Sequence, residues 1–258
     1  MVLKKAYIIG YPLEHSLSPD MHNAAYKAHG LDYIYQKMEL PELTRKNIDV
    51  LRAENCLGAN VTVPHKKTAA QLVDELDESA RLTGSVNTIV NRAGRLIGYS
   101  TDGPGYLESL KQSDIDPSGK SIVIYGTGGA AQAIIPLLQP LAKSLNIVAI
   151  DSPRPDTAAI KAADMIINAT PLGMYPKINE TILPDTSGIH RGQIYSDIVY
   201  NPRETLFLRN AAAKGAITHP GWGMLLYQGV LAFCLLTDIP QNKVPIDIMR
   251  QTLLAKLA

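Results

Sequence analysis

The sequence is poor in several residue types on which particular kinds of site depend. Its 258 residues include two cysteines, one tryptophan and two phenylalanines. Cys56 and Cys234 are isolated and match no metal-ligand spacing, and free thiols are typical of the cytoplasm, where we expect the protein. The apolar run at the N-terminus is broken at Pro12 and is too short for a signal peptide or a membrane span.

Neither sign of charge is in excess. There are 25 Lys and Arg residues against 24 Asp and Glu residues, which gives little support to nucleic-acid or membrane binding. His15, His22 and His65 have no recognised ligand spacing, so we expect no metal site. The apolar fraction of 46% and the length suit a globular protein with one large or two modest domains.

Residues 1–102 read as an α/β domain. A buried strand is expected at 6–10, followed by a helix that starts with Ser18 as N-cap and Pro19 in its first turn and stops at Gly30. The later patterns predict a strand at 57–63, a helix at 69–83, and a hairpin of 86–90 with 96–99.

From residue 103 to 229 strands and helices alternate, which predicts a Rossmann-type, doubly wound parallel sheet. Two helices are expected at 222–237 and 243–257. Their residues from about 230 to 258 should return to the first domain and complete it. The expected elements of the alternating part are 121–125, 128–139, 145–150, 156–163, 164–169, 194–199 and 204–214.

A glycine-rich turn joins the first of these strands to its helix. Gly126 would permit the tight turn, and Gly128 would let backbone amides approach a pyrophosphate at the start of the helix. This strand–turn–helix context predicts dinucleotide binding, although a flexible loop is the simpler alternative. Asp151, after the next strand, could bind a ribose 2′-hydroxyl or only cap a turn, and Arg154 could instead attract a 2′-phosphate.

Polar residues gather at predicted strand ends in the first domain. Ser16 and Ser18 follow the first strand, Asn60 and Thr62 share one face of another, and Asn87 lies within a strand, where amides are disfavoured. Asp102 comes directly after the hairpin. Each could be a cap, a turn or a solvated residue, but together they predict a polar cleft at a sheet edge, where ligands collect in α/β proteins.

An ordered set of motifs from residue 10 to 228 resembles the shikimate dehydrogenase family. The motifs are Gly-Tyr-Pro-Leu-Glu-His-Ser-Leu-Ser-Pro from Gly10, Asn-Val-Thr-Val-Pro-His-Lys from Asn60, Gly-Ser-Val-Asn-Thr-Ile from Gly84, Ser-Thr-Asp-Gly-Pro-Gly from Ser100, Gly-Thr-Gly-Gly-Ala from Gly126, Ile-Asn-Ala-Thr-Pro-Leu-Gly-Met from Ile167, Asp-Ile-Val-Tyr-Asn-Pro from Asp197, and Gly-Trp-Gly-Met-Leu-Leu-Tyr-Gln from Gly221.

The resemblance implies a two-domain enzyme with its active cleft between the domains. It implies reversible, NAD(P)-dependent reduction of 3-dehydroshikimate to shikimate, on the route to chorismate and the aromatic amino acids. Lys66 and Asp102 would be the acid–base pair. The implied substrate contacts are Ser16, Ser18, Thr62, Asn87 and Gln228, with Asn60 and Tyr200 nearby. The implied cofactor contacts are Gly126, Gly128, Gly129, Ala130, Asp151, Thr170, Ile198 and Gly221, with Arg154 as the possible phosphate partner.

Three departures from the family pattern affect these expectations. Ser100 replaces an Asn, with a small expected effect. Asp151-Ser152-Pro153 replaces Asn-Arg-Thr, so NAD competes with the NADP that the family favours. The segment between Asp151 and Asn168 is short, which predicts a nucleotide domain that lacks an edge strand and most of a helix.

Two other functions remain open at this stage. One is a quinate or aminoshikimate dehydrogenase of the same family, against which Ser18 weighs slightly. The other is a non-catalytic ligand sensor on this fold, which could dispense with Lys66 or Asp102, although both are present here. A homodimer is possible.

Overall fold

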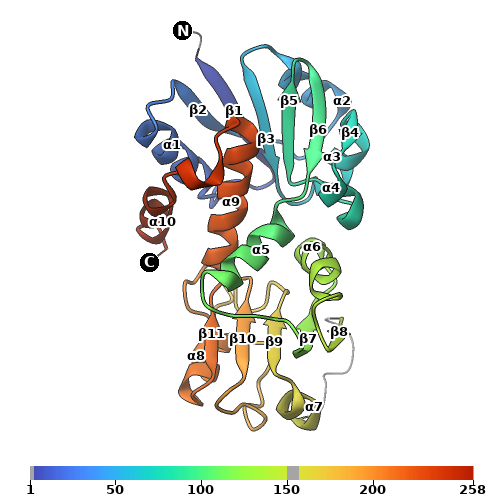
Figure 1. Cartoon of the computed structure of the whole chain (residues 1–258), viewed down its shortest axis with the longest axis vertical. Helices are drawn as coiled ribbons and strands as arrows, with labels where there is room; N and C mark the ends of the chain where they lie inside the picture. The colour runs from blue at the N-terminus through green and yellow to red at the C-terminus, as the bar shows by residue number, and fades with distance from the viewer. Residues whose placement is uncertain (1–2, 150–156, 258) are drawn as a thin grey trace. The chain divides into compact units, whose positions relative to one another are not determined.

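The structure, a computed structural model, describes residues 3–149 and 157–257 (Figure 1). The chain forms two compact units. Unit 1 comprises Met1–Gly105 and Leu226–Lys256, and unit 2 comprises Tyr106–Leu225 and Leu257–Ala258. Each unit has its own sheet.

Unit 1 is built on a six-stranded sheet of order β2-β1-β3-β5-β6-β4. Strand β1 is parallel to both β2 and β3, whereas β5 runs antiparallel to β3 and to β6. The short β4 pairs in parallel with β6. The strands are β1 (Lys4–Gly10), β2 (Tyr33–Glu39), β3 (Cys56–Val61), β4 (Glu75–Leu76), β5 (Thr88–Arg92) and β6 (Arg95–Tyr99).

Helices pack against this sheet, and two of them, α3 and α5, begin with Lys66 and Asp102. A buried cluster that includes Ile9, Ala59 and Ile89 joins the sheet to Ile48 and Ala69 on α2 and α3. Helix α9 lies against the sheet, with Leu236 beside Gly58 (Figure 1). Position 58 requires glycine because it has a positive φ and a Cβ there would clash with the Ile89 carbonyl of β5. The helices are α1 (Ser18–Ala28), α2 (Arg45–Asp49), the 3-10 turn Val50–Arg52, α3 (Lys66–Leu72), α4 (Glu78–Thr83), α5 (Asp102–Lys111), α9 (Trp222–Thr237), the 3-10 turn Gln241–Lys243 and α10 (Ile246–Leu254).

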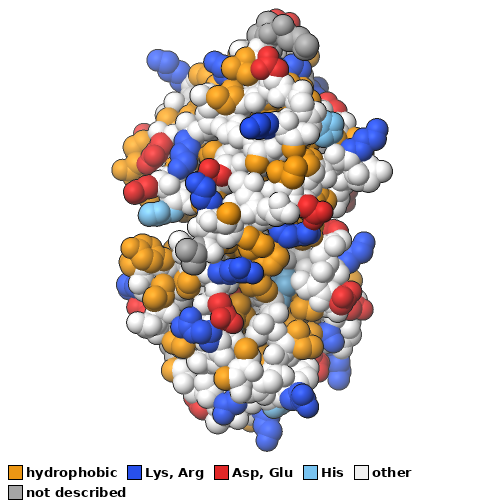
Figure 2. Space-filling view, turned by 90° about the vertical axis from the view of Figure 1, so that its left-hand side faces the viewer, with side chains coloured by type: hydrophobic (Ala, Val, Ile, Leu, Met, Phe, Trp, Pro, Cys, Tyr) orange, Lys and Arg blue, Asp and Glu red, His pale blue; other side chains and the backbone are white. Residues whose placement is uncertain are grey.

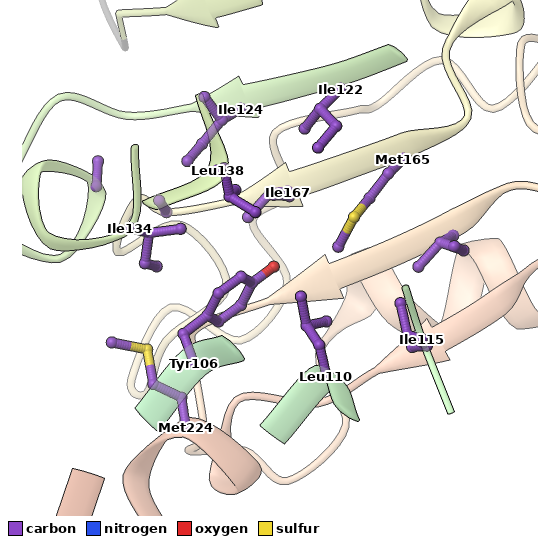
Figure 3. Close-up of a cluster of buried hydrophobic side chains, with 13 residues drawn as sticks. Tyr106, Leu110, Ile115, Ile122, Ile124, Ile134, Leu138, Met165, Ile167 and Met224 are labelled. Carbon is purple, nitrogen blue, oxygen red and sulfur yellow. The ribbon is translucent and has the colours of Figure 1, made fainter. Parts of the chain in front are cut away.

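Unit 2 contains the predicted doubly wound parallel sheet, of order β11-β10-β9-β7-β8. Side chains of β7 alternate between two cores: Ile122 and Ile124 pack with α5 and α6 (Figure 3), and Val123 and Tyr125 pack with α7 and α8. The elements are β7 (Ser121–Tyr125), α6 (Gly129–Leu138), β8 (Ser144–Val148), α7 (Thr157–Ala162), β9 (Met165–Asn168), β10 (Ile194–Asp197), α8 (Leu206–Ala213) and β11 (Ile217–His219).

The strand order of unit 2 reverses next to β7. From β7 the chain goes to β8 on one side and then returns to β9 on the other. In open parallel sheets, ligands bind at the carboxyl ends of the two strands that flank such a switch point. The glycine-rich turn after β7 and the segment after β9 therefore meet where a nucleotide is expected.

Several details of the sequence-based prediction were wrong. The helix expected at 69–83 is divided into α3, strand β4 and α4, because Glu75 and Leu76 pair with β6. Ser18 is the first residue of α1 and Leu17 is its N-cap, so Ser18 does not cap the helix. Strands β2 and β11 and helix α2 were not predicted.

Candidate functional site

Three strands of unit 1 bring residues distant in sequence to one edge of the sheet. In the register of the sheet, Asn60 of β3 lies opposite Thr88 of β5, and Thr88 lies opposite Tyr99 of β6. Since β5 is antiparallel to its neighbours, its beginning meets the ends of β3 and β6. The segments that contain Asn87 and Asp102 therefore adjoin the segment that leads from β3 to Lys66.

Lys66 and Asp102 form an ion pair at this edge. The Lys66 Nζ lies 2.6 Å from the Asp102 Oδ2, and the two side chains are 20% and 10% exposed. Each residue opens a helix, α3 and α5 respectively. The backbone N–H of Val86 donates to the Lys66 carbonyl at 3.0 Å, which ties the start of α3 to the segment before β5. The pair is thus fixed from both helices yet still reaches solvent.

Asn87 joins this pair to the sheet. Its Nδ2 donates to Asp102 Oδ1 at 2.8 Å and to Thr101 Oγ1 at 2.9 Å, and its Oδ1 accepts from the Thr101 backbone N–H at 2.7 Å. The side chain is buried. The amide that the sequence placed in an unfavourable strand environment therefore has several polar partners, one of which is the Asp102 carboxylate.

Asn60 of β3 is buried beside Asn87. Its Oδ1 accepts from the Tyr35 hydroxyl at 2.7 Å, and its Nδ2 donates to Thr88 Oγ1 at 2.9 Å and to the Asn87 carbonyl at 3.2 Å. It is only 4% exposed. With the amide held by three protein groups, Asn60 supports the edge of the sheet.

Ser16, Ser18 and Thr62 follow the same sheet edge. Thr62 comes directly after β3, and its methyl group lies where a side chain at Gly10 would have to be, so β1 must end in a glycine. Ser18 is buried at the start of α1, and Ser16 is half-buried in the turn before it. These hydroxyls come from the segments that follow the ends of β1 and β3.

Gln228 approaches the edge from α9. A Cβ at Gly105 would lie 2.5 Å from the backbone N of Gln228 and 2.7 Å from its Cα. Gly105 lies in the first turn of α5, which begins at Asp102. The absence of a side chain at 105 therefore lets α9 bring Gln228 next to the turn that carries the carboxylate.

In unit 2, the turn after β7 has the geometry that a dinucleotide needs. Gly126 has φ +114°, and a Cβ there would lie 2.5 Å from the Ala169 carbonyl oxygen, so this position requires glycine. Gly128 and Gly129 are exposed, with no atom within 4 Å of an added Cβ, and Ala130 is half-buried beside them. Because α6 starts at Gly129, its free N–H groups face open space that a phosphate can fill.

A buried polar cluster supports the neighbouring loops of unit 2. Asn168 accepts from the Thr170 backbone N–H and hydroxyl at 3.0 and 2.7 Å, and donates to Asp197 Oδ1 at 2.9 Å. Asp197 also accepts from the Val199 N–H and the Thr205 hydroxyl. Burial raises the pKa of the Asp197 carboxyl to about 7, although these hydrogen bonds act in the opposite direction.

Ile198 and Gly221 meet in the same unit. The Ile198 N–H donates to the Asn168 carbonyl at 3.0 Å, and the backbone of Gly221 packs so closely on the Ile198 carbonyl that a side chain there would clash. Tyr200 lies two residues further on, where burial raises the pKa of its hydroxyl. The two predicted cofactor contacts Asp151 and Arg154 lie outside the described residues.

The described residues form neither a metal-binding cluster nor a membrane-spanning helix. Among residues 3–149 and 157–257, no group of three or more His, Cys, Asp or Glu side chains could hold a metal ion. Within the same residues, no helix has the length and apolar character needed to cross a membrane. On the face shown in Figure 2, Lys and Arg side chains are scattered among Asp and Glu side chains rather than gathered into one basic surface.

Comparison with known proteins decides the family. Residues 8–89 match the family described as "Shikimate dehydrogenase substrate binding domain". Over 96% of both chains, the sequence is 39% identical to "Shikimate dehydrogenase (NADP(+))" of Alkaliphilus metalliredigens. The chain belongs to the shikimate dehydrogenase family.

Solved structures of the family share the fold described above. The shikimate 5-dehydrogenase of Listeria monocytogenes, solved in complex with shikimate and NAD, is 32% identical with a TM-score of 0.87, and the match covers 96% of each chain. The quinate dehydrogenase of Corynebacterium glutamicum, in complex with NAD, is 28% identical with a TM-score of 0.86, over 98% of this chain and 100% of that one.

Within this family member, several residues that hold the site together were missed by the sequence reasoning. Tyr35, Thr88 and Thr101 connect Asn60 and Asn87 in unit 1. In unit 2, His219 bonds Ser109 and Ser196, and burial lowers the pKa of its imidazole to about 4. The threonines stood beside Asn87 and Asp102 in quoted motifs, which was a signal, whereas Tyr35 lies in a strand that was not predicted.

Proposed function

We propose that the chain reduces 3-dehydroshikimate reversibly to shikimate with a nicotinamide cofactor, as a shikimate dehydrogenase of aromatic amino-acid biosynthesis. The observation that carries this proposal is the Lys66–Asp102 pair, 2.6 Å apart, at a sheet edge where Asn87 bonds the same carboxylate. The family's defining chemistry needs a proton donor beside a ketone, and this pair can provide one.

The chemistry follows from where charge develops. As a ketone is reduced, negative charge grows on its oxygen, and a donor within hydrogen-bond reach stabilises that charge. Lys66 gives a proton to this oxygen, and Asp102 orients the ammonium and balances its charge. In the oxidation direction, Lys66 takes the proton from the substrate hydroxyl. Asn87 holds Asp102 at its other oxygen, so the carboxylate does not turn away.

The ring substituents of the substrate are assigned to polar groups around the pair. The hydroxyls and the carboxylate bind to Ser16, Ser18, Thr62, Asn87 and Gln228. Asn60 supports this set by donating a hydrogen bond to the Asn87 carbonyl. Tyr200, which belongs to unit 2, is assigned to the substrate from the family pattern. Hydroxyls and amides suit a polyol acid because each can both donate and accept.

The cofactor is assigned to unit 2. The positive φ of Gly126, the open space at Gly128 and Gly129 and the N-terminus of α6 suit a pyrophosphate. Ala130, Thr170, Ile198 and Gly221 would line the rest, and Asp151 or Arg154 would choose between NAD and NADP. The nicotinamide, when bound, supplies the hydride. We expect NADP to serve, because the Alkaliphilus relative is named for it, and NAD to compete.

These assignments imply a division of labour along the chain. Residues 1–102 with about 230–258 form the substrate-binding domain, and 103–229 form the dinucleotide-binding domain. The two compact units, which divide after Gly105 and Leu225, support this proposal. We also expect a cytoplasmic protein, consistent with its free cysteines, and a homodimer is the arrangement to test by light scattering.

One assay tests the function. Purified protein is mixed with shikimate or quinate, each with NAD or NADP, and the absorbance of the reduced cofactor is followed. We expect turnover with shikimate that disappears in Lys66→Ala. Faster turnover of quinate would favour the second candidate, a quinate dehydrogenase. The similarity to the Corynebacterium quinate dehydrogenase is the reason to test this candidate. No turnover with any of the four pairs would contradict both and favour a ligand sensor.

A further inference from the structure

A continuous chain of hydrogen bonds links Tyr35 of β2 to the Lys66–Asp102 pair. The Tyr35 hydroxyl donates to Asn60 Oδ1 at 2.7 Å, and Asn60 Nδ2 donates to Thr88 Oγ1 at 2.9 Å. The Thr88 hydroxyl donates to Asn87 Oδ1 at 3.2 Å, and Asn87 Nδ2 donates to Asp102 Oδ1 at 2.8 Å. Strands β2, β3 and β5 and helix α5 are thus connected through side chains.

Two backbone groups fix the direction of this chain. The Asn87 carbonyl can only accept, so the atom of Asn60 next to it is Nδ2, and Asn60 Oδ1 must face Tyr35. The Thr101 backbone N–H can only donate, so the atom of Asn87 next to it is Oδ1, and Nδ2 must face Asp102. Every donor therefore points towards the carboxylate, an arrangement in which each bond polarises the next.

Tyr35 is itself held rigidly at the far end. Asn23 of α1 accepts from the Tyr35 backbone N–H at 2.8 Å and donates to its carbonyl at 2.9 Å. The ring of His22 stacks on the Tyr35 ring, with centroids 4.4 Å apart and planes 9° from parallel. Burial lowers the pKa of His22 to about 3, so its ring is neutral at neutral pH. Tyr35 is 2% exposed, which leaves it no surface for a substrate.

We propose that Tyr35 is a positioning residue for the reaction: through Asn60 and Thr88 its hydroxyl aligns Asn87 on Asp102 and stabilises the charged carboxylate. This inference rests on the proposed function. Without the hydroxyl, the buried Asn60 Oδ1 has no donor, while the Asn87 carbonyl still holds Nδ2 in place. The bonds from Asn60 to Thr88 and from Thr88 to Asn87 therefore lose the polarisation that the Tyr35 hydroxyl supplied. The bond from Asn87 Nδ2 to Asp102 Oδ1, on the side away from Lys66, is then weaker, and the charged carboxylate is less stabilised.

The test compares Tyr35→Phe with Tyr33→Phe. Tyr33 lies on the same strand and the same face, and its hydroxyl belongs to no part of this chain of bonds. For Tyr35→Phe we expect kcat for shikimate oxidation to fall about tenfold, the loss of about one hydrogen bond of transition-state stabilisation, with KM for shikimate almost unchanged. The acidic limb of the kcat–pH profile should move to higher pH. Tyr33→Phe should resemble the unmodified protein.

A second substitution within the chain of bonds guards against a folding effect. Thr88→Val removes the middle hydroxyl at nearly constant shape, so it should reproduce the lower kcat and the shifted profile. Tyr35→Phe combined with Thr88→Val should then be little worse than either alone, because both interrupt one connection. Additive losses, or a Tyr35→Phe enzyme with the kcat and pH profile of Tyr33→Phe, would overturn the proposal.

Two failures remain distinguishable in this design. If the unmodified protein does not turn over shikimate, the proposed function is wrong. If it does, and Tyr35→Phe changes only the melting temperature or KM, Tyr35 has a structural role and the inference alone is wrong.

Discussion

At the scale of single residues, the site combines a largely buried ion pair that still reaches solvent with enclosed groups that hold it. Lys66 and Asp102 retain access to solvent, whereas Asn60 and Asn87 are almost fully enclosed. Because a buried amide without hydrogen-bond partners destabilises the protein, burial holds each side-chain amide to the particular partners that it has here. The acid–base chemistry that we propose for the pair would therefore depend on side chains that do not all reach the substrate.

Replacing the proton donor should affect the rate far more than binding. Lys66→Ala should lower kcat for shikimate oxidation by about 100-fold or more, since general acid–base groups contribute on this order. KM should change little, because the proton is transferred only in the transition state. Steady-state kinetics will measure both. The control is Lys67→Ala at the neighbouring exposed lysine; a similar loss there would contradict the assignment.

The buried His22 should make stability depend on pH. Neither ring nitrogen has a hydrogen-bond partner, and burial lowers its pKa to about 3. The unfolded chain takes up a proton near pH 6.5 that the folded protein excludes, so stability is full above that pH and falls as the pH drops towards 3. Between pH 7 and pH 5 this loss is about 2 kcal/mol.

Urea unfolding at these two pH values tests this effect. His22→Phe should remove most of its share of the pH dependence and should not lower stability at pH 5. His29→Phe, at the exposed C-cap of the same helix, is the control and should leave the pH dependence as it is. An unchanged pH dependence in His22→Phe would show that another group is responsible.

At the scale of elements, the sequence predicted those whose pattern reflects local physics. Strand β7 and helix α6 were predicted because an apolar run, a glycine turn and a helical pattern follow each other. Strand β2 was missed because, as an edge strand, it exposes Gln36 and Lys37 and lacks an apolar pattern. Glu75 and Leu76 were assigned to a helix because their pairing with β6 depends on residues far along the chain.

The same reasoning explains which site residues could be predicted. Asn87 and Asp102 stood out as polar residues within or after predicted strands, and Lys66 through the resemblance to the family. The structure places Lys66 and Asn87 in contact with the Asp102 carboxylate. Gly105 carried no chemical signal of its own. Its importance follows from the contact between α5 and α9, which only the folded chain displays.

The turn between β7 and α6 allows stability and cofactor binding to be separated. Gly126→Ala should destabilise the protein by about 1–3 kcal/mol, because its Cβ would meet the Ala169 carbonyl in a positive-φ conformation. Gly128→Ala should leave the melting temperature of the free protein unchanged, since the space there is open and its φ is −73°. It should nevertheless raise KM for the cofactor, because the methyl group occupies the expected phosphate position.

Thermal melting and cofactor titration of both variants provide the comparison. If Gly128→Ala binds NADP and NAD as well as the unmodified protein does, the phosphate is not bound at this turn.

At the scale of the whole molecule, ligands should stabilise the fold by mass action. Shikimate at about 100 times its dissociation constant should add about 2.7 kcal/mol to the free energy of unfolding. Because Lys66 is assigned to chemistry more than to affinity, Lys66→Ala should keep most of this stabilisation while losing turnover. A thermal shift assay with shikimate, quinate and each cofactor measures this. A variant that loses both properties would make Lys66 a binding residue.

The division of the sequence between the two units also has a consequence for synthesis. Unit 2 is almost one uninterrupted segment, whereas unit 1 needs residues 226–256, which leave the ribosome after all of residues 106–225. A growing chain can therefore finish its nucleotide-type sheet before most of α9 and all of α10, which unit 1 needs, have left the ribosome. A premature stop near residue 225 would leave a nascent protein with its glycine turn complete and its Lys66–Asp102 edge without Gln228.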